Sequence, residues 1–283
     1  MSVRIIIDSS ADFDNETAEK LGLTVLPMKT IFGDEEFAEG VDITREEFYE
    51  KLVETDEFPR TSQIPPYEFA CAFEKIDPAD EAVVITLSGK LSGTVDSARS
   101  AAAAFGGRVH VVDSENVTVG ARILIERAVS LRDAGLDAAE IARMLDVEKK
   151  RIHVLAALDT LEYLKRGGRI PSAVAFAGEL LSIKPVVGVV DGEVRVLGKA
   201  RGSKQGNNML RRMIAEAGID FSMPLHLGYT GLSDKYLRKY IADSREIFEA
   251  HMDDLPVSIV GSTIGTHVGP GAIAVAWFAP ESE

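Results

Sequence analysis

Three clusters of small polar residues each stand between a predicted strand and a predicted helix. They are DSSAD at residues 8–12, RTSQIPP at 60–66 and TLSGKLSGTVDSA at 86–98. Turns of this kind gather at one edge of a parallel sheet, which is where open α/β folds bind ligands. Hydroxyl and backbone N–H donors collected there would bind an anion such as a carboxylate or a phosphate.

The third cluster gives the most specific indication of chemistry. Its small residues, Gly93 among them, let the backbone approach a ligand closely. The helix predicted to begin there points unpaired N–H groups and the positive end of its dipole at the same place. The hydroxyls of Ser92 and Thr61 would add donors. Ordinary N-capping by Ser, Thr and Asp is the alternative explanation of these turns.

A serine nucleophile is the enzymatic alternative. Ser62, Ser88 and Ser92 are the candidates, but SGKLSG does not match the GxSxG elbow of serine hydrolases. The sequence does not give the distance from any serine to a histidine. The GxxxxGK[ST] spacing of a phosphate-binding loop is also absent, so ATP binding by this chain is not supported.

His267 lies in STIGTHVGPGAIAVAWF (residues 262–278), between a threonine and a Gly-Pro-Gly turn. It is either a packed core residue or a functional one, because imidazole donates to a carboxylate when neutral and pairs with it when protonated. Two basic clusters, KRGGRI at 165–170 and GKARGSKQ at 198–205, contain Arg169 and Arg201. These two clusters either bind an anion or form a solvent-exposed surface.

The composition argues against a nucleic-acid-binding, a metal-binding or a membrane-inserted protein. The 283 residues carry a formal net charge of −14, which argues against nucleic acid as the main partner. The one cysteine, Cys71, falls in an apolar helical pattern and is predicted to be buried. No CxxC or HExxH motif is present, so no metal site is predicted. Without a signal peptide or a long apolar span, a cytoplasmic location and no membrane insertion are expected.

Apolar strand-like segments alternate with helical patterns through the first half of the chain. This alternation predicts an α/β fold with a mainly parallel sheet and helices on both faces. The predicted strands are 3–8, 82–87, 108–113 and 152–158, with 23–32 extended, and the predicted helices are 15–22, 44–54 behind a Thr44 capping box, 65–76, 93–105, 117–134 and 137–149.

The pattern changes near residues 160–170. An apolar helix is predicted after Pro171, followed by a hairpin over 186–200 with Asp191 and Gly192 at its turn. A helix at 203–217, a strand at 225–231, a helix at 233–244 and two late strands complete a smaller α/β region. The predicted domains are therefore 1–165 and 166–283.

Taken in order, these motifs resemble the DegV family over residues 5 to about 278. The resemblance lies in IIIDSSAD (5–12), TSQIPPYEF (61–69), ITLSGKLSGTVDSA (85–98), VVDSENVTVG (111–120), LDTLEYLKRGGRI (158–170), LLSIKPVV (180–187) and IGTHVGPGAIAV (264–275). It implies a two-domain α/β protein that holds one long-chain fatty acid between its domains and needs no other cofactor. The family includes non-catalytic subunits that present the fatty acid carboxylate to a separate DhaK/DhaL-like kinase subunit, in phospholipid metabolism.

Matched position by position, the resemblance also implies roles for individual residues. Thr61, Ser62, Ser92, Gly93 and His267 correspond to the carboxylate-binding set, and Arg169 and Arg201 to head-group or kinase-docking residues. One departure is Lys90, which stands beside the site where the family pattern reads SSxLSGT. A stand-alone serine hydrolase and a lipid sensor without a kinase remain the alternatives.

Overall fold

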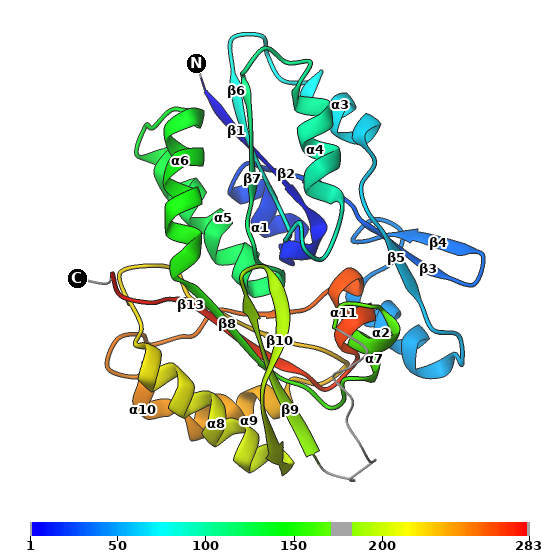
Figure 1. Cartoon of the computed structure of the whole chain (residues 1–283), viewed down its shortest axis with the longest axis vertical. Helices are drawn as coiled ribbons and strands as arrows, with labels where there is room; N and C mark the ends of the chain where they lie inside the picture. Colours follow the sequence, from blue (N-terminus) through cyan, green and yellow to red (C-terminus); the bar gives the residue numbers. More distant parts are fainter. Residues whose placement is uncertain (1, 171–182, 282–283) are drawn as a thin grey trace.

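The computed structural model describes residues 2–170 and 183–281. The apolar helix predicted after Pro171 therefore lies outside the described residues. Two sheets with their own helices make up most of the chain, and a third, smaller sheet lies beside them (Figure 1).

The first sheet has four parallel strands in the order β2-β1-β6-β7. Side chains alternate along β1, so that Ile5 and Ile7 enter one hydrophobic core while Ile6 enters another. Helices α1, α5 and α6 cover the first face, and α3 and α4 cover the second. The predicted α/β fold with helices on both faces is confirmed. The bounds are β1 Val3–Asp8, β2 Leu23–Leu26, β6 Glu81–Thr86, β7 Val109–Asp113, α1 Asn15–Lys20, α3 Pro66–Phe73, α4 Thr94–Ala102, α5 Thr118–Asp133 and α6 Ala138–Glu148, with short 3-10 turns at Ser9–Ala11 and Lys149–Arg151.

The second sheet has six strands in the order β10-β9-β8-β13-β11-β12, all antiparallel except the β11–β12 pair. Helices α8 and α9 pack on one face, while α5 lies against the other, between the two large sheets. The predicted hairpin turn is confirmed, with Asp191 and Gly192 both at positive φ. The bounds are β8 Ile152–Ala157, β9 Ile183–Val190, β10 Glu193–Arg201, β11 His226–Tyr229, β12 Val257–Ile259, β13 Ile273–Phe278, α8 Gly202–Ala217, α9 Lys235–Asp243 and α10 Arg245–Phe248.

A three-stranded antiparallel sheet, β4-β3-β5, lies beside the short helices α2, α7 and α11. The Thr44 capping box that opens α2 is confirmed by both of its reciprocal hydrogen bonds. The segment predicted as one extended stretch over 23–32 is divided between two sheets, since β2 joins the first and β3 the third. The bounds are β3 Lys29–Phe32, β4 Glu35–Ala38, β5 Arg60–Ser62, α2 Arg45–Glu54, α7 Glu162–Arg166 and α11 Ser262–Val268.

The prediction that Cys71 is buried was wrong, because its side chain is exposed. Helix α3 buries Phe69, Ala72 and Phe73, and position 71 falls on the opposite side of the helix. The division at 165/166 stays a prediction. Strand β8 precedes that division but pairs within the second sheet.

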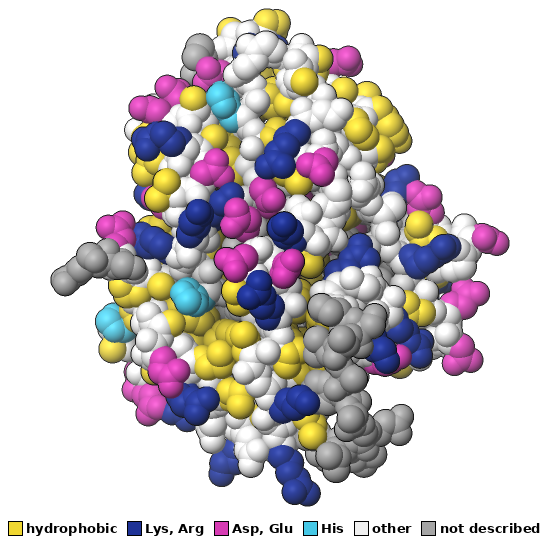
Figure 2. Space-filling model, in the orientation of Figure 1, with side chains coloured by type: hydrophobic (Ala, Val, Ile, Leu, Met, Phe, Trp, Pro, Cys, Tyr) yellow, Lys and Arg dark blue, Asp and Glu magenta, His cyan; other side chains and the backbone are white. Residues whose placement is uncertain are grey.

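The surface mixes charges of both signs. On the face seen in Figure 2, basic and acidic side chains are interleaved, and hydrophobic side chains gather below them. Among the helices that the structure describes, none combines the length and the apolar character that a membrane crossing requires.

Candidate functional site

A cavity of about 190 Å³ brings together residues from both halves of the chain. Of the residues predicted for the site, Thr61, Ser92, Gly93, Arg169 and His267 line it, and Ser62 and Arg201 do not. The other lining residues are Met28, Gln63, Leu87, Leu91, Val117, Leu164, Val194, Thr263, Ile264 and Val268.

Thr61 and Ser62 are consecutive residues of strand β5, but only Thr61 lines the cavity. Thr61 pairs with Thr30 of β3, and its hydroxyl lies 2.9 Å from His267 Nε2. Successive side chains on a strand point to opposite faces, so Ser62 turns away from the cavity while Gln63 lines it again. The expectation that this cluster lies at the edge of the parallel sheet was wrong, since β5 belongs to the small antiparallel sheet.

The third cluster does lie at the end of a parallel strand, β6. It leads into α4, and the residues just before that helix line the cavity. Gly93 is the N-cap residue of that helix and has no side chain to cap it. The Ser92 hydroxyl lies 2.9 Å from Thr94 Oγ1 and accepts from the Thr94 N–H at 3.3 Å. A Cβ at position 93 would lie 2.2 Å from Gln63 Oε1, so any larger residue there would displace the Gln63 side chain.

His267 is a buried, neutral donor or acceptor at the centre of the cavity wall. It lies in α11, a helix that the sequence analysis did not predict. Burial, and then the nearby Arg169 guanidinium, lowers the pKa of His267 to about 4. Among the described residues, Nδ1 has no hydrogen-bond partner, while Nε2 lies next to Thr61. The imidazole therefore carries no charge at neutral pH and can rearrange its bonding around a ligand.

The imidazole of His267 is expected to titrate well below pH 6 in the ligand-free protein. Because its pKa is lowered from 6.5 to about 4, the unfolded chain binds the proton first as the pH falls. This histidine's contribution to stability is thus complete above about pH 6.5 and declines towards pH 4. An NMR titration of the imidazole nitrogens measures the midpoint, and a value near 6.5 would contradict the buried, neutral assignment.

Arg169 supplies positive charge at the cavity. It follows α7, is half-buried, and is the only charged side chain among the described residues that line the cavity. Its guanidinium donates to the carbonyl oxygens of Leu91 and Gly167, which links the end of α7 to the third cluster. Arg201, in contrast, is exposed at the end of β10, and Lys90 is also exposed.

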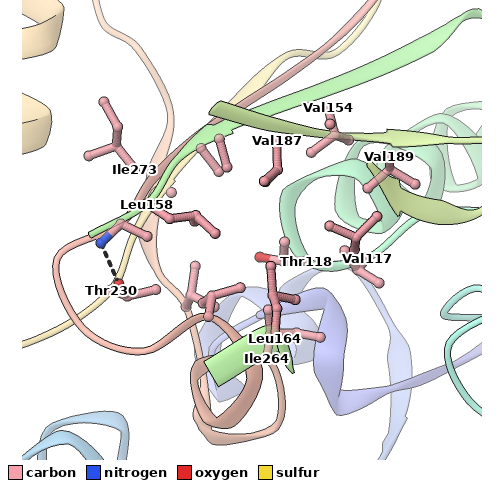
Figure 3. A pocket seen from close by; sticks show the side chains of 18 of the residues that line it. Val117, Thr118, Val154, Leu158, Leu164, Val187, Val189, Thr230, Ile264 and Ile273 are labelled. Carbon is pink, nitrogen blue, oxygen red and sulfur yellow. Dashed lines mark hydrogen bonds between the residues drawn. The ribbon is translucent and has the colours of Figure 1, made fainter. Parts of the chain in front are cut away.

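An apolar chamber of about 60 Å³ continues from this polar cavity. In Figure 3, Val154, Val187 and Ile264 converge on it from two neighbouring strands and a helix. The chamber and the polar cavity share the lining residues Val117, Leu164, Val194, Ile264 and Val268.

The two threonine hydroxyls in the chamber already have protein partners. Thr118 donates to Asp12 at 2.5 Å, and Thr230 accepts from the Ala272 N–H at 2.8 Å. These hydroxyls therefore need no hydrogen bond from a ligand, and the chamber offers mainly apolar contact. Together the two spaces fit a molecule with an anionic head and an apolar tail.

The geometry does not favour a serine nucleophile. Ser88 is fully buried and donates to the carbonyl oxygen of Gly192 at 2.7 Å. The Ser92 hydroxyl is hydrogen-bonded to that of Thr94, and the imidazole of His267 is hydrogen-bonded to Thr61. Within the described part of the chain no serine hydroxyl is hydrogen-bonded to the imidazole of His267, which a Ser–His pair requires.

Sequence reasoning missed two polar residues of the cavity, Gln63 and Thr263. Gln63 stood in the second cluster and follows Thr61 by two positions, so strand alternation was a signal for it. Thr263 could be found only from the unpredicted helix α11, which carries Thr263 and His267 one turn apart.

Comparison with known proteins gives relatives along the whole chain. A family model described as "Uncharacterised protein, DegV family" matches residues 2–280. A DegV domain-containing protein of Deinococcus radiodurans is 34% identical over 282 residues, which is 98% of each chain. A solved DegV family protein from Thermus thermophilus, described by its fatty acid binding, is 30% identical with a TM-score of 0.86 over 99% of this chain and 100% of its own. DegV of Bacillus subtilis, described as a fatty acid binding protein, is 27% identical with a TM-score of 0.85 over 99% and 100%. This chain belongs to the DegV family.

Proposed function

We propose that this protein binds one long-chain fatty acid, with the carboxylate in the polar cavity and the acyl tail in the apolar chamber. The observation that carries the proposal is the continuity of the two spaces through five shared residues. The Thermus thermophilus and Bacillus subtilis relatives, both described as binding fatty acids, support it.

Burial of the tail supplies the main favourable term, because each methylene taken out of water contributes about 0.8 kcal/mol before association costs. A carboxylate taken out of water needs several donors. Thr61, Ser92, His267 and Arg169 line the polar cavity and are the donors proposed for it.

Calorimetric titration of delipidated protein with palmitate, hexadecanol and hexanoate tests this assignment. Palmitate is expected to bind with one site per chain and more tightly than either of the other two ligands. Hexadecanol keeps the tail but lacks the charge, and hexanoate keeps the charge but lacks most of the tail. Equal affinity for palmitate and hexadecanol would remove the carboxylate site from the proposal.

Replacing Thr61 by valine is expected to weaken palmitate binding by about threefold to tenfold. The substitution keeps the volume but removes a hydroxyl next to a buried carboxylate, which costs on the order of 1 kcal/mol. Ser62→Val is the matched control, because it is the next residue of β5 and does not line the cavity. Calorimetry on both variants gives the comparison, and equal losses would place the effect in the strand rather than in the ligand.

We further propose that the bound carboxylate is presented to a separate DhaK/DhaL-like kinase subunit, which forms the acyl phosphate, and that this occurs in the cytoplasm. The resemblance of the KRGGRI motif to the DegV family supports the proposal, as does the exposure of Arg201 outside the cavity. By itself the protein is then expected to turn over neither fatty acid nor ATP.

Arg201→Ala is expected to leave palmitate affinity unchanged and to lower acyl phosphate formation by about tenfold in a reconstituted bacterial fatty acid kinase reaction, as for a lost interfacial arginine. Arg195→Ala is the control, since Arg195 is another partly exposed arginine on β10. Loss of palmitate binding in the Arg201 variant would instead make Arg201 part of the lipid site. Palmitate binding with no phosphorylation by any such kinase would favour the lipid sensor.

A further inference from the structure

The first turn of α11 is held by the carboxylate of Glu39, which follows β4. Glu39 Oε1 accepts from the Thr263 N–H at 2.9 Å and from the Ser262 hydroxyl at 3.2 Å. Oε2 accepts from the hydroxyls of Thr263 at 2.8 Å and Ser9 at 2.6 Å. Both carboxylate oxygens are therefore used, and three of the four donors belong to α11.

The helix held in this way supplies one wall of the proposed lipid site. Thr263, Ile264, His267 and Val268 all come from α11 and line the polar cavity. Positions 263 and 267 are one turn apart and share a face. A change in the first turn of so short a helix therefore moves His267 relative to Thr61.

The backbone at the start of α11 is fitted closely to Glu39. A Cβ at Gly261 would lie 2.2 Å from Glu39 Oε1 and 2.9 Å from Asp12 Oδ1. The Gly261 N–H also donates to Asp12 Oδ1 at 2.7 Å. The start of α11 is therefore packed against both carboxylates, and a side chain at position 261 would displace that of Glu39.

Glu39 also borders a second cavity, of about 220 Å³, on the other side of the helix start. Its lining includes Ser9, Asp12, Arg45 and Ser262, and none of its lining residues belongs to the polar cavity. Glu39 is 8% exposed. A small carboxylate in solution thus has a space through which to reach the position of the Glu39 side chain.

We propose that Glu39 is a positioning residue of the fatty acid site: by binding the first turn of α11 it sets the place of His267 and Thr263 in the cavity wall. This inference rests on the proposed function for its effect on lipid affinity. Its effect on His267 itself does not depend on a ligand.

Glu39→Ala and Glu39→Gln in the full chain test the proposal, with Glu81→Ala as the matched control. Glu81 accepts from the Ala138 N–H at the start of α6, which lines neither the polar cavity nor the apolar chamber. Palmitate affinity is expected to fall by about tenfold in Glu39→Ala and by less in Glu39→Gln, whose amide oxygen still accepts hydrogen bonds at one of the two carboxylate oxygen positions. Glu81→Ala is expected to lower the melting temperature without changing palmitate affinity.

Two readouts separate positioning from general destabilisation. Sodium formate is expected to restore palmitate affinity in Glu39→Ala, by replacing the missing carboxylate, and to have no such effect on the wild type. The imidazole NMR signals of His267 in ligand-free protein are expected to shift in both Glu39 variants and not in Glu81→Ala. If Glu39→Ala does not fold, the palmitate affinity and the His267 signals of Glu39→Gln test the proposal without the formate measurement.

Wild-type palmitate affinity with unshifted His267 signals in the folded Glu39 variants would overturn the proposal. Failure of the wild type to bind palmitate would refute the proposed function instead. In that case the His267 signals alone decide whether Glu39 positions α11.

Discussion

Palmitate affinity is expected to fall by about a hundredfold or more when Val194 is replaced by tryptophan. Val194 lies on β10, is half-buried, and lines both the polar cavity and the apolar chamber. A large side chain there blocks the junction and excludes the tail from the chamber. Losing the burial of about four methylenes costs roughly 3 kcal/mol, which is a factor of about a hundred.

The control for this substitution is Arg195→Trp. Arg195 is the next residue of β10, and its side chain points to the opposite face and is 51% exposed. Isothermal titration of both variants with palmitate and hexanoate gives the comparison. Hexanoate is expected to lose little affinity in the Val194 variant, because its tail hardly reaches the chamber. Equal palmitate affinity in the two variants would place the tail elsewhere.

His267→Ala is expected to weaken palmitate binding by about 1–3 kcal/mol, or roughly fivefold to 150-fold, since a buried charged acceptor loses a donor. The imidazole is 8% exposed and faces the cavity next to Thr61. Ser92→Ala is expected to act in the same direction, because Ser92 lines the same cavity.

A neutral ligand provides the control for His267→Ala. Hexadecanol places no carboxylate next to the imidazole, so its affinity is expected to change much less than that of palmitate. His267→Gln keeps a donor and is expected to recover part of the loss. Unchanged palmitate affinity in both His267→Ala and Ser92→Ala would contradict the carboxylate assignment.

Local patterns in the sequence were sufficient to predict part of the arrangement that lines the cavity. Ser92 and Gly93 follow a strand and open a helix, and this local arrangement is what the structure shows. The alternation of strands and helices likewise predicted the parallel sheet, because period and turn residues are local properties. His267 and Arg169 were candidates from the sequence itself, the resemblance to one family implied their roles, and the cavity brings them together.

The remaining features depend on contacts between distant residues. Thr61 and Ser62 look equivalent in the sequence, and only the pairing of β5 with β3 shows which of them faces His267. Helix α11 was not predicted because six of its seven residues are small or β-branched, and its first turn is held by Glu39, more than 220 positions earlier. Helix α5 is buried on several sides because it packs between two sheets. The helical period of apolar residues predicts one buried face and does not show this second contact.

The central claim is that the protein holds a long-chain fatty acid, and solvent extraction of the purified protein followed by mass spectrometry tests it most directly. The account predicts close to one long-chain fatty acid per chain, and a strongly reduced amount in the Val194→Trp variant. A wild-type protein that yields no fatty acid, and that binds neither added palmitate nor added oleate, would contradict it.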